Sequence, residues 1–294
     1  MVTQILNIIS IWVKMSFIIN QANIINMKVS IFTTMTNPEE RMDPWKEALN
    51  CYESIADEVI VVGADWPEEF KWDHIGKTFN QGLEQCSGDW VINLSLDMFI
   101  HEKDISKLIA NLKKHQEYPA VAFPKNKFFS PYRFQVKAFE ACAINKKIFP
   151  EVRFGGGGDL CLPILGNTVL NQNNVPISRT PLWNYDTTFR TKEIIAHDRA
   201  RFARAWNRQF NDWGDRGGGT PEEAFDAWFS MIKLRLKSQT RKAKLEHHPK
   251  YIQDKLAKLE SNQFGYDCFG EANKNSPGIS DYIEACKIRV KFKI

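Results

Sequence analysis

The chain has 294 residues, enough for one large domain or two modest ones with a hydrophobic core. Hydrophobic residues make up 43% of it and charged residues 25%, which excludes an intrinsically disordered chain. The net charge of +4 is too small to argue for nucleic acid as a partner, although it suits an anionic ligand.

The first 26 residues are apolar but interrupted by polar residues and by Lys14. They lack the pattern of a signal peptide and the uninterrupted apolar run of a transmembrane helix. We expect residues 1–26 to be an extension outside the fold, with a helix on a membrane surface as the less favoured alternative. Six scattered cysteines without metal-finger spacing indicate reduced core residues of a cytoplasmic protein.

From Met27 onward, short apolar runs alternate with helical patterns. Asp43 is expected to cap a helix that begins with Pro44. The apolar run EVIVVGAD is expected to be a strand buried on both faces. The alternation predicts an α/β fold with a parallel sheet. The expected strands are 28–34, 58–65, 90–97 and 120–124, and the expected helices include 74–86 and 104–116.

The later chain has a different pattern. Residues 121–150 contain two β-like runs, typical of a hairpin, and GGGGDLCLP at 155–163 is expected to be a flexible loop. From about residue 191 the chain is expected to be helical. Thr220 and Glu223 have the spacing of a capping box, and a further helix is expected near 250–260.

Ligands of parallel α/β sheets bind at the carboxyl ends of the strands. This rule places the loop after Thr34, Asp65 and Asp97 on one rim. The order of elements over residues 28–195 resembles the nucleotide-diphosphosugar transferase (GT-A) fold and, more narrowly, family 2 glycosyltransferases. The resemblance is carried by SIFTTMTNPEE, EVIVVGAD, GKTFNQGLEQCSGDWVINLSLD and PLWNYDTTFRTKEII.

The resemblance implies a mostly parallel central sheet flanked by helices over residues 27–195, with a helical C-terminal extension over 196–294. It implies an enzyme that moves a sugar from a nucleotide diphosphate donor to an acceptor hydroxyl of a glycan, lipid or protein, with inversion. Asp159 lies where the family places the catalytic base. The implied donor-binding residues are Thr33, Thr34, Asn37, Glu39, Asp65, Lys77, Asn80, Ser95, Asp97 and Arg190.

A divalent cation, Mn²⁺ or Mg²⁺, would neutralise the donor diphosphate as a Lewis acid. The resemblance implies Asp97 and Asn184 as its ligands. Ser95 and Asn184 depart from the family pattern, which has an aspartate and a histidine at these positions, and both departures weaken the case for a metal.

Several candidate residues also fit a purely structural role. Asp97 and Asp65 suit turn caps, Lys77 and Asn80 a solvated helix face, and Asp159 a loop. The basic, aromatic stretch 199–208 suits a solvated helix better than a nucleic-acid surface. His197 and Asp198 are further polar residues near a helix start. The alternatives are therefore a non-catalytic nucleotide- or sugar-binding protein on the same fold and, third, a nucleotidyltransferase.

Overall fold

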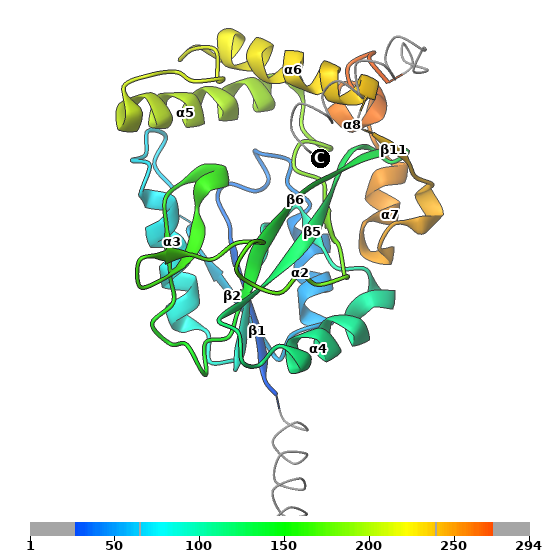
Figure 1. Cartoon of the computed structure of the whole chain (residues 1–294). Coiled ribbons are helices and arrows are strands. Elements are labelled where there is room, and N and C mark those ends of the chain that lie inside the picture. Colours follow the sequence, from blue (N-terminus) through cyan, green and yellow to red (C-terminus); the bar gives the residue numbers. More distant parts are fainter. Residues whose placement is uncertain (1–26, 65, 239, 273–294) are drawn as a thin grey trace, which may run out of the picture.

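A computed structural model describes residues 27–64, 66–238 and 240–272 of the chain (Figure 1). A central sheet of eight strands is surrounded by helices. In spatial order its strands are β2 (Glu58–Val62), β1 (Val29–Thr34), β3 (Trp90–Asn93), β6 (Arg133–Ile144), β5 (Ala120–Ser130), β10 (Leu182–Asn184) and β4 (Met98–Phe99), with β11 (Arg241–Lys242) paired to β6.

Strand direction confirms the predicted α/β class. β1 is parallel to β2 and β3, and β10 is parallel to β5. β6 is antiparallel to both β3 and β5, and β4 is antiparallel to β10. Consequently β2, β1, β3, β5 and β10 all point the same way, and the sheet is mostly parallel.

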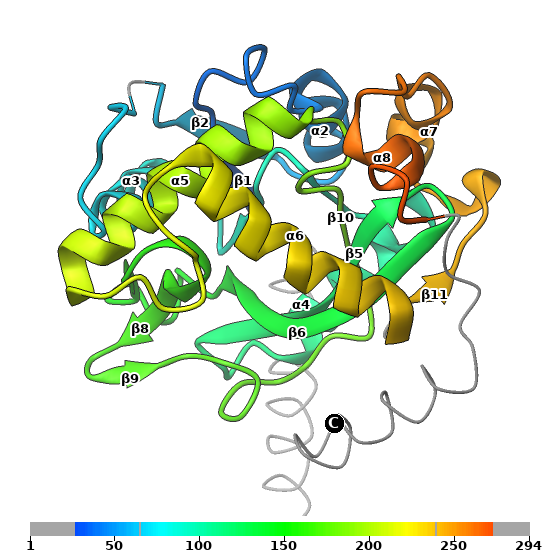
Figure 2. The same cartoon turned by 90° about the horizontal axis from the view of Figure 1, so that it is seen from above.

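The helices cover both faces and one edge of this sheet. α2, α4 and α7 pack on one face, and α3 packs on the other together with the small sheet β7–β8–β9. α5 and α6 lie across the edge where β1 and β3 end (Figures 1 and 2). The helices are α2 (Trp45–Glu53), α3 (His74–Gln85), α4 (Ile105–Lys114), α5 (Lys192–Phe210), α6 (Pro221–Ser238), α7 (Lys250–Ala257) and α8 (Phe264–Asp267). The remaining elements are β7 (Arg153–Gly155), β8 (Leu162–Leu165), β9 (Thr168–Val169) and the short 3₁₀ helices η1 (Glu102–Asp104), η2 (Gly158–Leu160) and η3 (Leu245–His247).

Local sequence signals account for several of these elements. The predicted apolar stripe of α3 is buried at Ile75 and Leu83. The predicted capping box at the start of α6 is confirmed. The Thr220 hydroxyl accepts from the Glu223 N–H at 3.3 Å, and a Glu223 carboxylate oxygen accepts from the Thr220 N–H at 3.2 Å.

Three local expectations were wrong. β2 is the outermost strand of the sheet and is only partly buried, with Val61 45% exposed, because no strand covers its outer side. Asp43 does not cap α2. Pro44 is the residue that precedes this helix, no side-chain hydrogen bond caps it, and the Asp43 carboxylate instead forms ion pairs. The glycine-rich segment 155–163 is structured, since it ends β7, forms η2 and begins β8.

The C-terminal helices are integrated with the sheet. The expected domain boundary at 195/196 falls inside α5, and Ile252 and Leu256 of α7 belong to the same hydrophobic core as Ile92 of β3. The five cysteines in the described ranges are buried free thiols. None of the described helices combines the length and apolarity needed to cross a membrane. The N-terminal extension 1–26 lies outside the described residues.

Candidate functional site

Two carboxylates meet where β3 and β10 reach the carboxyl edge of the sheet. Asp97 follows the end of β3, and its carbonyl oxygen accepts a 2.8 Å hydrogen bond from the N–H of Tyr185. This bond brings the next residue, Asp186, close enough for the two charges to interact. Oδ1 of Asp97 is buried and has no hydrogen-bond partner within the described ranges. A buried carboxylate oxygen without a partner is costly unless a ligand or an ion satisfies it.

The two carboxylates have opposite shifts in pKa. Burial, reinforced by repulsion from Asp186, raises the pKa of Asp97 to about 7. Burial also opposes ionisation of Asp186, but Lys127, Arg199 and Arg190 hold the pKa of its carboxyl well below the usual range. Nζ of Lys127 lies 2.7 Å and Nη2 of Arg199 lies 3.0 Å from Oδ2 of Asp186. Asp186 therefore carries a full negative charge, whereas Asp97 titrates near neutral pH.

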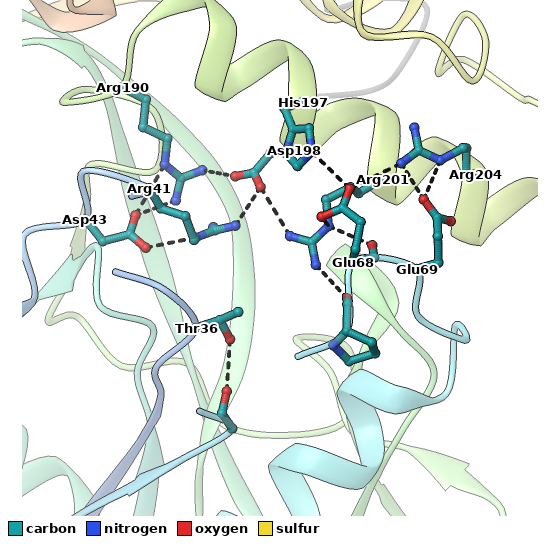
Figure 3. A network of polar contacts seen from close by, with 12 residues as sticks. Thr36, Arg41, Asp43, Glu68, Glu69, Arg190, His197, Asp198, Arg201 and Arg204 are labelled. Atoms are coloured by element: carbon teal, nitrogen blue, oxygen red, sulfur yellow. Dashed lines mark hydrogen bonds and ion pairs between the residues drawn. The ribbon is translucent and has the colours of Figure 1, made fainter. Parts of the chain in front are cut away.

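A buried ion network lies beside this pair and joins the loop after β1 to α5 (Figure 3). The Arg190 guanidinium lies 2.5 Å from Asp43 and 3.0 Å from Asp198. Arg41 contacts the same two carboxylates, at 3.1 Å for Asp43 and 2.7 Å for Asp198. Arg190, a predicted donor contact, is thus already engaged by three carboxylates of the protein, since Asp186 also lies 3.9 Å from its guanidinium.

A cavity of about 290 Å³ opens beside the network, between the loops that follow β1 and β2 and the first turns of α5. The loops are held in place by polar contacts. The Thr36 hydroxyl donates to the Gly63 carbonyl at 3.1 Å, and Arg201 donates to the carbonyls of Pro67 and Glu68, both at 2.9 Å. The cavity is lined by Thr36, Asn37, Glu40, Arg41, Glu68, Glu193, Ile194, His197, Asp198 and Arg201. Its volume is close to the lower end for small-molecule sites.

The residues predicted to hold the nucleoside are only partly brought together. Asn37 lines the cavity and has a φ of 41°, in the left-handed region that asparagine tolerates. Thr33 is buried and Thr34 half-buried at the end of β1. Glu39 is exposed and accepts a hydrogen bond from an indole N–H of α2. Asp65 lies outside the described residues.

The predicted helix residues Lys77 and Asn80 make contacts within the protein. Lys77 is a surface residue whose side chain is 69% exposed and forms an ion pair of 2.7 Å with Asp73, the residue just before α3. The Asn80 amide donates to the Phe154 carbonyl at 2.9 Å and accepts from the Phe154 N–H at 2.6 Å. Asn80 therefore joins α3 to β7.

The remaining predicted residues are Ser95, Asn184 and Asp159. Ser95 is half-buried, and its carbonyl oxygen accepts from the Tyr52 hydroxyl at 2.6 Å. Asn184 is buried in β10, between β5 and β4. The backbone of Asp159 belongs to η2, and its side chain lies outside what the structure describes.

Sequence reasoning did not find Asp186, Lys127 or Arg199. The sequence did contain a signal for Asp186 and for Lys127. Lys127 interrupts the apolar pattern of a buried strand, and Asp186 lies two residues after the end of another strand of the same sheet. A lysine in a buried strand needs a counter-charge, and an acidic residue at the end of a neighbouring strand is the natural partner.

No protein-family profile matches the sequence, and no curated protein matches it. Among solved structures, S. aureus TarS 1–349 in complex with UDP-GlcNAc aligns with a TM-score of 0.39 and 14% identity, over 72% of this chain and 81% of that chain. The longer S. aureus TarS structure aligns with a TM-score of 0.37 and 13% identity, over 65% of this chain and 45% of that chain. The chain thus spans less than half of that longer structure, and at these scores the likeness assigns neither a fold nor a function.

Proposed function

We propose that this chain is a glycosyltransferase with a GT-A-like fold, which moves a sugar from a nucleoside diphosphate to an acceptor hydroxyl. The observation that carries the proposal is the pair Asp97 and Asp186, with an unpartnered carboxylate oxygen, at the carboxyl edge of a mostly parallel sheet. Arg190 links this pair to the cavity, since it pairs with Asp186 and with Asp198, which lines the cavity. Ligands of α/β sheets bind at this edge. The family 2 resemblance of the sequence motifs agrees in placing the donor there.

The donor would extend along this edge. Its nucleoside would occupy the cavity beside Asn37, and its diphosphate would approach Asp97. Positive charge for the diphosphate is available from Lys127 and Arg199, which already lie within hydrogen-bonding distance of Asp186. Arg190, a predicted donor contact, also pairs with Asp186 at 3.9 Å and would add to this positive charge, whereas Lys77 pairs with Asp73 on the surface.

The residues at the carboxyl edge of the sheet supply some of the ligands that a divalent cation needs. Asp97 offers the unpartnered Oδ1 and Asp186 a carboxylate, whereas no group of three His, Cys, Asp or Glu side chains gathers within the described ranges. Mn²⁺ or Mg²⁺ accepts one or two protein carboxylates when phosphate and water oxygens complete its coordination. Such a cation, when bound, would neutralise charge on the departing diphosphate. Asn184 remains a predicted further ligand.

Asp159 remains the proposed catalytic base. An inverting transfer needs a carboxylate that takes the proton of the acceptor hydroxyl as the new glycosidic bond forms. Replacing Asp159 by Asn should abolish transfer while leaving donor binding intact, and unchanged turnover would remove Asp159 as the base.

Donor binding is tested by thermal shift with UDP-, GDP- and CDP-sugars, with and without Mn²⁺. One of these donors should raise the melting temperature of the wild type, and Asp97→Asn should weaken its binding at least tenfold. Asp254→Asn, at an exposed position on α7, is the matched control and should bind normally. If no sugar nucleotide stabilises the wild type, the donor site is refuted.

A second candidate function is non-catalytic binding of a nucleotide or sugar on the same fold. The engagement of Asp186 by Lys127 and Arg199 favours it, because a site whose charge is already balanced can bind a ligand without a cation. It predicts donor binding that is indifferent to Mn²⁺, and no release of nucleoside diphosphate from any sugar nucleotide. Detectable release that depends on Asp97 would exclude this candidate.

A further inference from the structure

Positive charge is concentrated in one part of the chain. Residues 233–258 contain nine Lys and Arg against two Asp and Glu, a formal charge of +7 in a chain whose total is +4. The rest of the sequence is therefore net acidic. A surface with mixed charges would keep the protein soluble equally well. The concentration of positive charge in one segment therefore indicates an anionic partner.

The fold gathers part of this segment at one corner of the molecule. Arg133, at the start of β6, donates to the Leu236 carbonyl at 2.7 Å and so ties the end of α6 to the β5–β6 turn. β11 pairs with the start of β6, and the Ala243 N–H donates to the Tyr132 carbonyl at 2.8 Å. We call the side chains gathered there the cationic corner. It consists of Lys237, Arg241, Lys242 and Lys244.

The cationic corner is exposed and mostly uncompensated. All four side chains are exposed, and Lys244 alone of the four has an ion pair within the described ranges, a long one of 3.8 Å to Glu246. Two apolar side chains project beside it. Tyr132, at the tip of the β5–β6 turn, is 57% exposed, and Leu234, one turn before Lys237 on the same face of α6, is 63% exposed.

We propose that the cationic corner docks this protein on a membrane surface that contains anionic lipid. Lysine and arginine provide the attraction to lipid headgroups, and Tyr132 and Leu234 enter the interfacial region, where aromatic and aliphatic side chains are favourable. A soluble polyanion would use the cations but would gain little from two projecting apolar side chains. The combination therefore favours the bilayer surface over a free polymer.

The test is co-sedimentation of the full-length protein with vesicles of phosphatidylcholine alone and with vesicles containing one third phosphatidylglycerol. The wild type should bind the anionic vesicles, and binding should fall steeply as salt is raised. Each neutralised cation should weaken binding by roughly fivefold, so R241Q/K242Q should lose at least tenfold. Tyr132→Ser should weaken binding without changing its dependence on salt.

The matched control is K113Q/K114Q, which removes the same charge from the last turn of α4, at the opposite end of the molecule in Figure 1. This variant should bind like the wild type. Equal losses in both double variants, or equal binding of the wild type to neutral vesicles, would overturn the proposal. Inorganic polyphosphate is the third probe. Tight binding of polyphosphate with no binding of anionic vesicles would also overturn it, in favour of a soluble polyanion.

Discussion

Asp186, which is half-buried, and Lys127, which is buried, form an ion pair at the centre of the candidate site. Lys127 is buried within β5, and its Nζ lies 2.7 Å from Asp186, which Arg199 also contacts. Removing one member of a buried pair leaves the other charge without compensation, which costs far more than replacing both members. The pair therefore has a structural role that any functional experiment on Asp186 must separate from catalysis.

Asp186→Asn should lower the free energy of unfolding by about 3 kcal/mol, because Lys127 loses its closest counter-charge. Urea denaturation measures the change. The double variant Lys127→Met with Asp186→Asn should recover part of the loss, because no buried charge then remains uncompensated. Strictly additive losses would show that the two side chains do not interact.

The buried His248 is held as a neutral imidazole by two different partners. Its Nε2 lies 2.7 Å from the Pro131 carbonyl oxygen, which can only accept, so Nε2 carries the proton. Nδ1 consequently accepts from the Tyr185 hydroxyl, also at 2.7 Å. Burial lowers the pKa of His248 from 6.5 to about 4.

This shift predicts a loss of stability in mild acid. The unfolded chain binds a proton near pH 6.5 and the folded chain only near pH 4, so the contribution of His248 is present above pH 6.5 and lost as the pH falls toward 4. Its share of the free energy of unfolding should drop by about 2 kcal/mol between pH 7.5 and pH 5. Urea titrations at both pH values should show a smaller drop for His248→Gln. An equal drop in the two proteins would contradict the assignment.

At the scale of elements, the glycine-rich segment is packed tightly against the residues before α3. Gly157 has extended backbone, with φ at −155°, so its conformation suits any residue. A Cβ at this position would lie 2.2 Å from the Trp72 carbonyl oxygen and 2.8 Å from the Trp72 indole. Glycine is required at position 157 by the close approach of another backbone.

Gly157→Ala should therefore displace the segment that carries Asp159 and lower the free energy of unfolding by about 2 kcal/mol. If Asp159 is the base, turnover should fall more than donor affinity. Urea denaturation and donor titration measure the two effects. Thr168→Ala, at an exposed position of β9, is the control and should change neither. If Gly157→Ala were as stable as the wild type, the backbone at Trp72 would have moved to make room for the added methyl group.

Over the whole molecule, the C-terminal helices and the sheet share one core. Ile252 of α7 is fully buried in the cluster that contains Ile92 and Leu94. Ile252→Ala should lower the free energy of unfolding by about 3 kcal/mol in one cooperative transition. Lys258→Ala, exposed after α7, should have little effect. Two separate transitions in Ile252→Ala would show that α7 belongs to an independent unit.

The sequence predicted most strands and helices, because periodicity and capping are local properties. It could not predict that β2 is the outermost strand, since the order of strands depends on contacts between distant segments. The same limit applies to the site. Asp97 was singled out because it ends the apolar run expected at 90–97, whereas the contacts of Arg190 and Asn80 depend on residues 147 and 74 positions away. Contacts with residues distant in the sequence therefore determine which of the predicted side chains can contact a ligand.

Arginines before and along α5 form ion pairs near the cavity that respond differently to ionic strength. The pair of Arg190 with Asp43 is buried, and dissolved ions scarcely reach it. Arg204 and Arg208 hold Glu69 at the surface, where salt screens the attraction. Concentrated salt should therefore weaken the hold on Glu69, whereas the hydrogen bonds from buried Arg201 to the Pro67 and Glu68 carbonyls keep the part of the same loop beside the cavity in place.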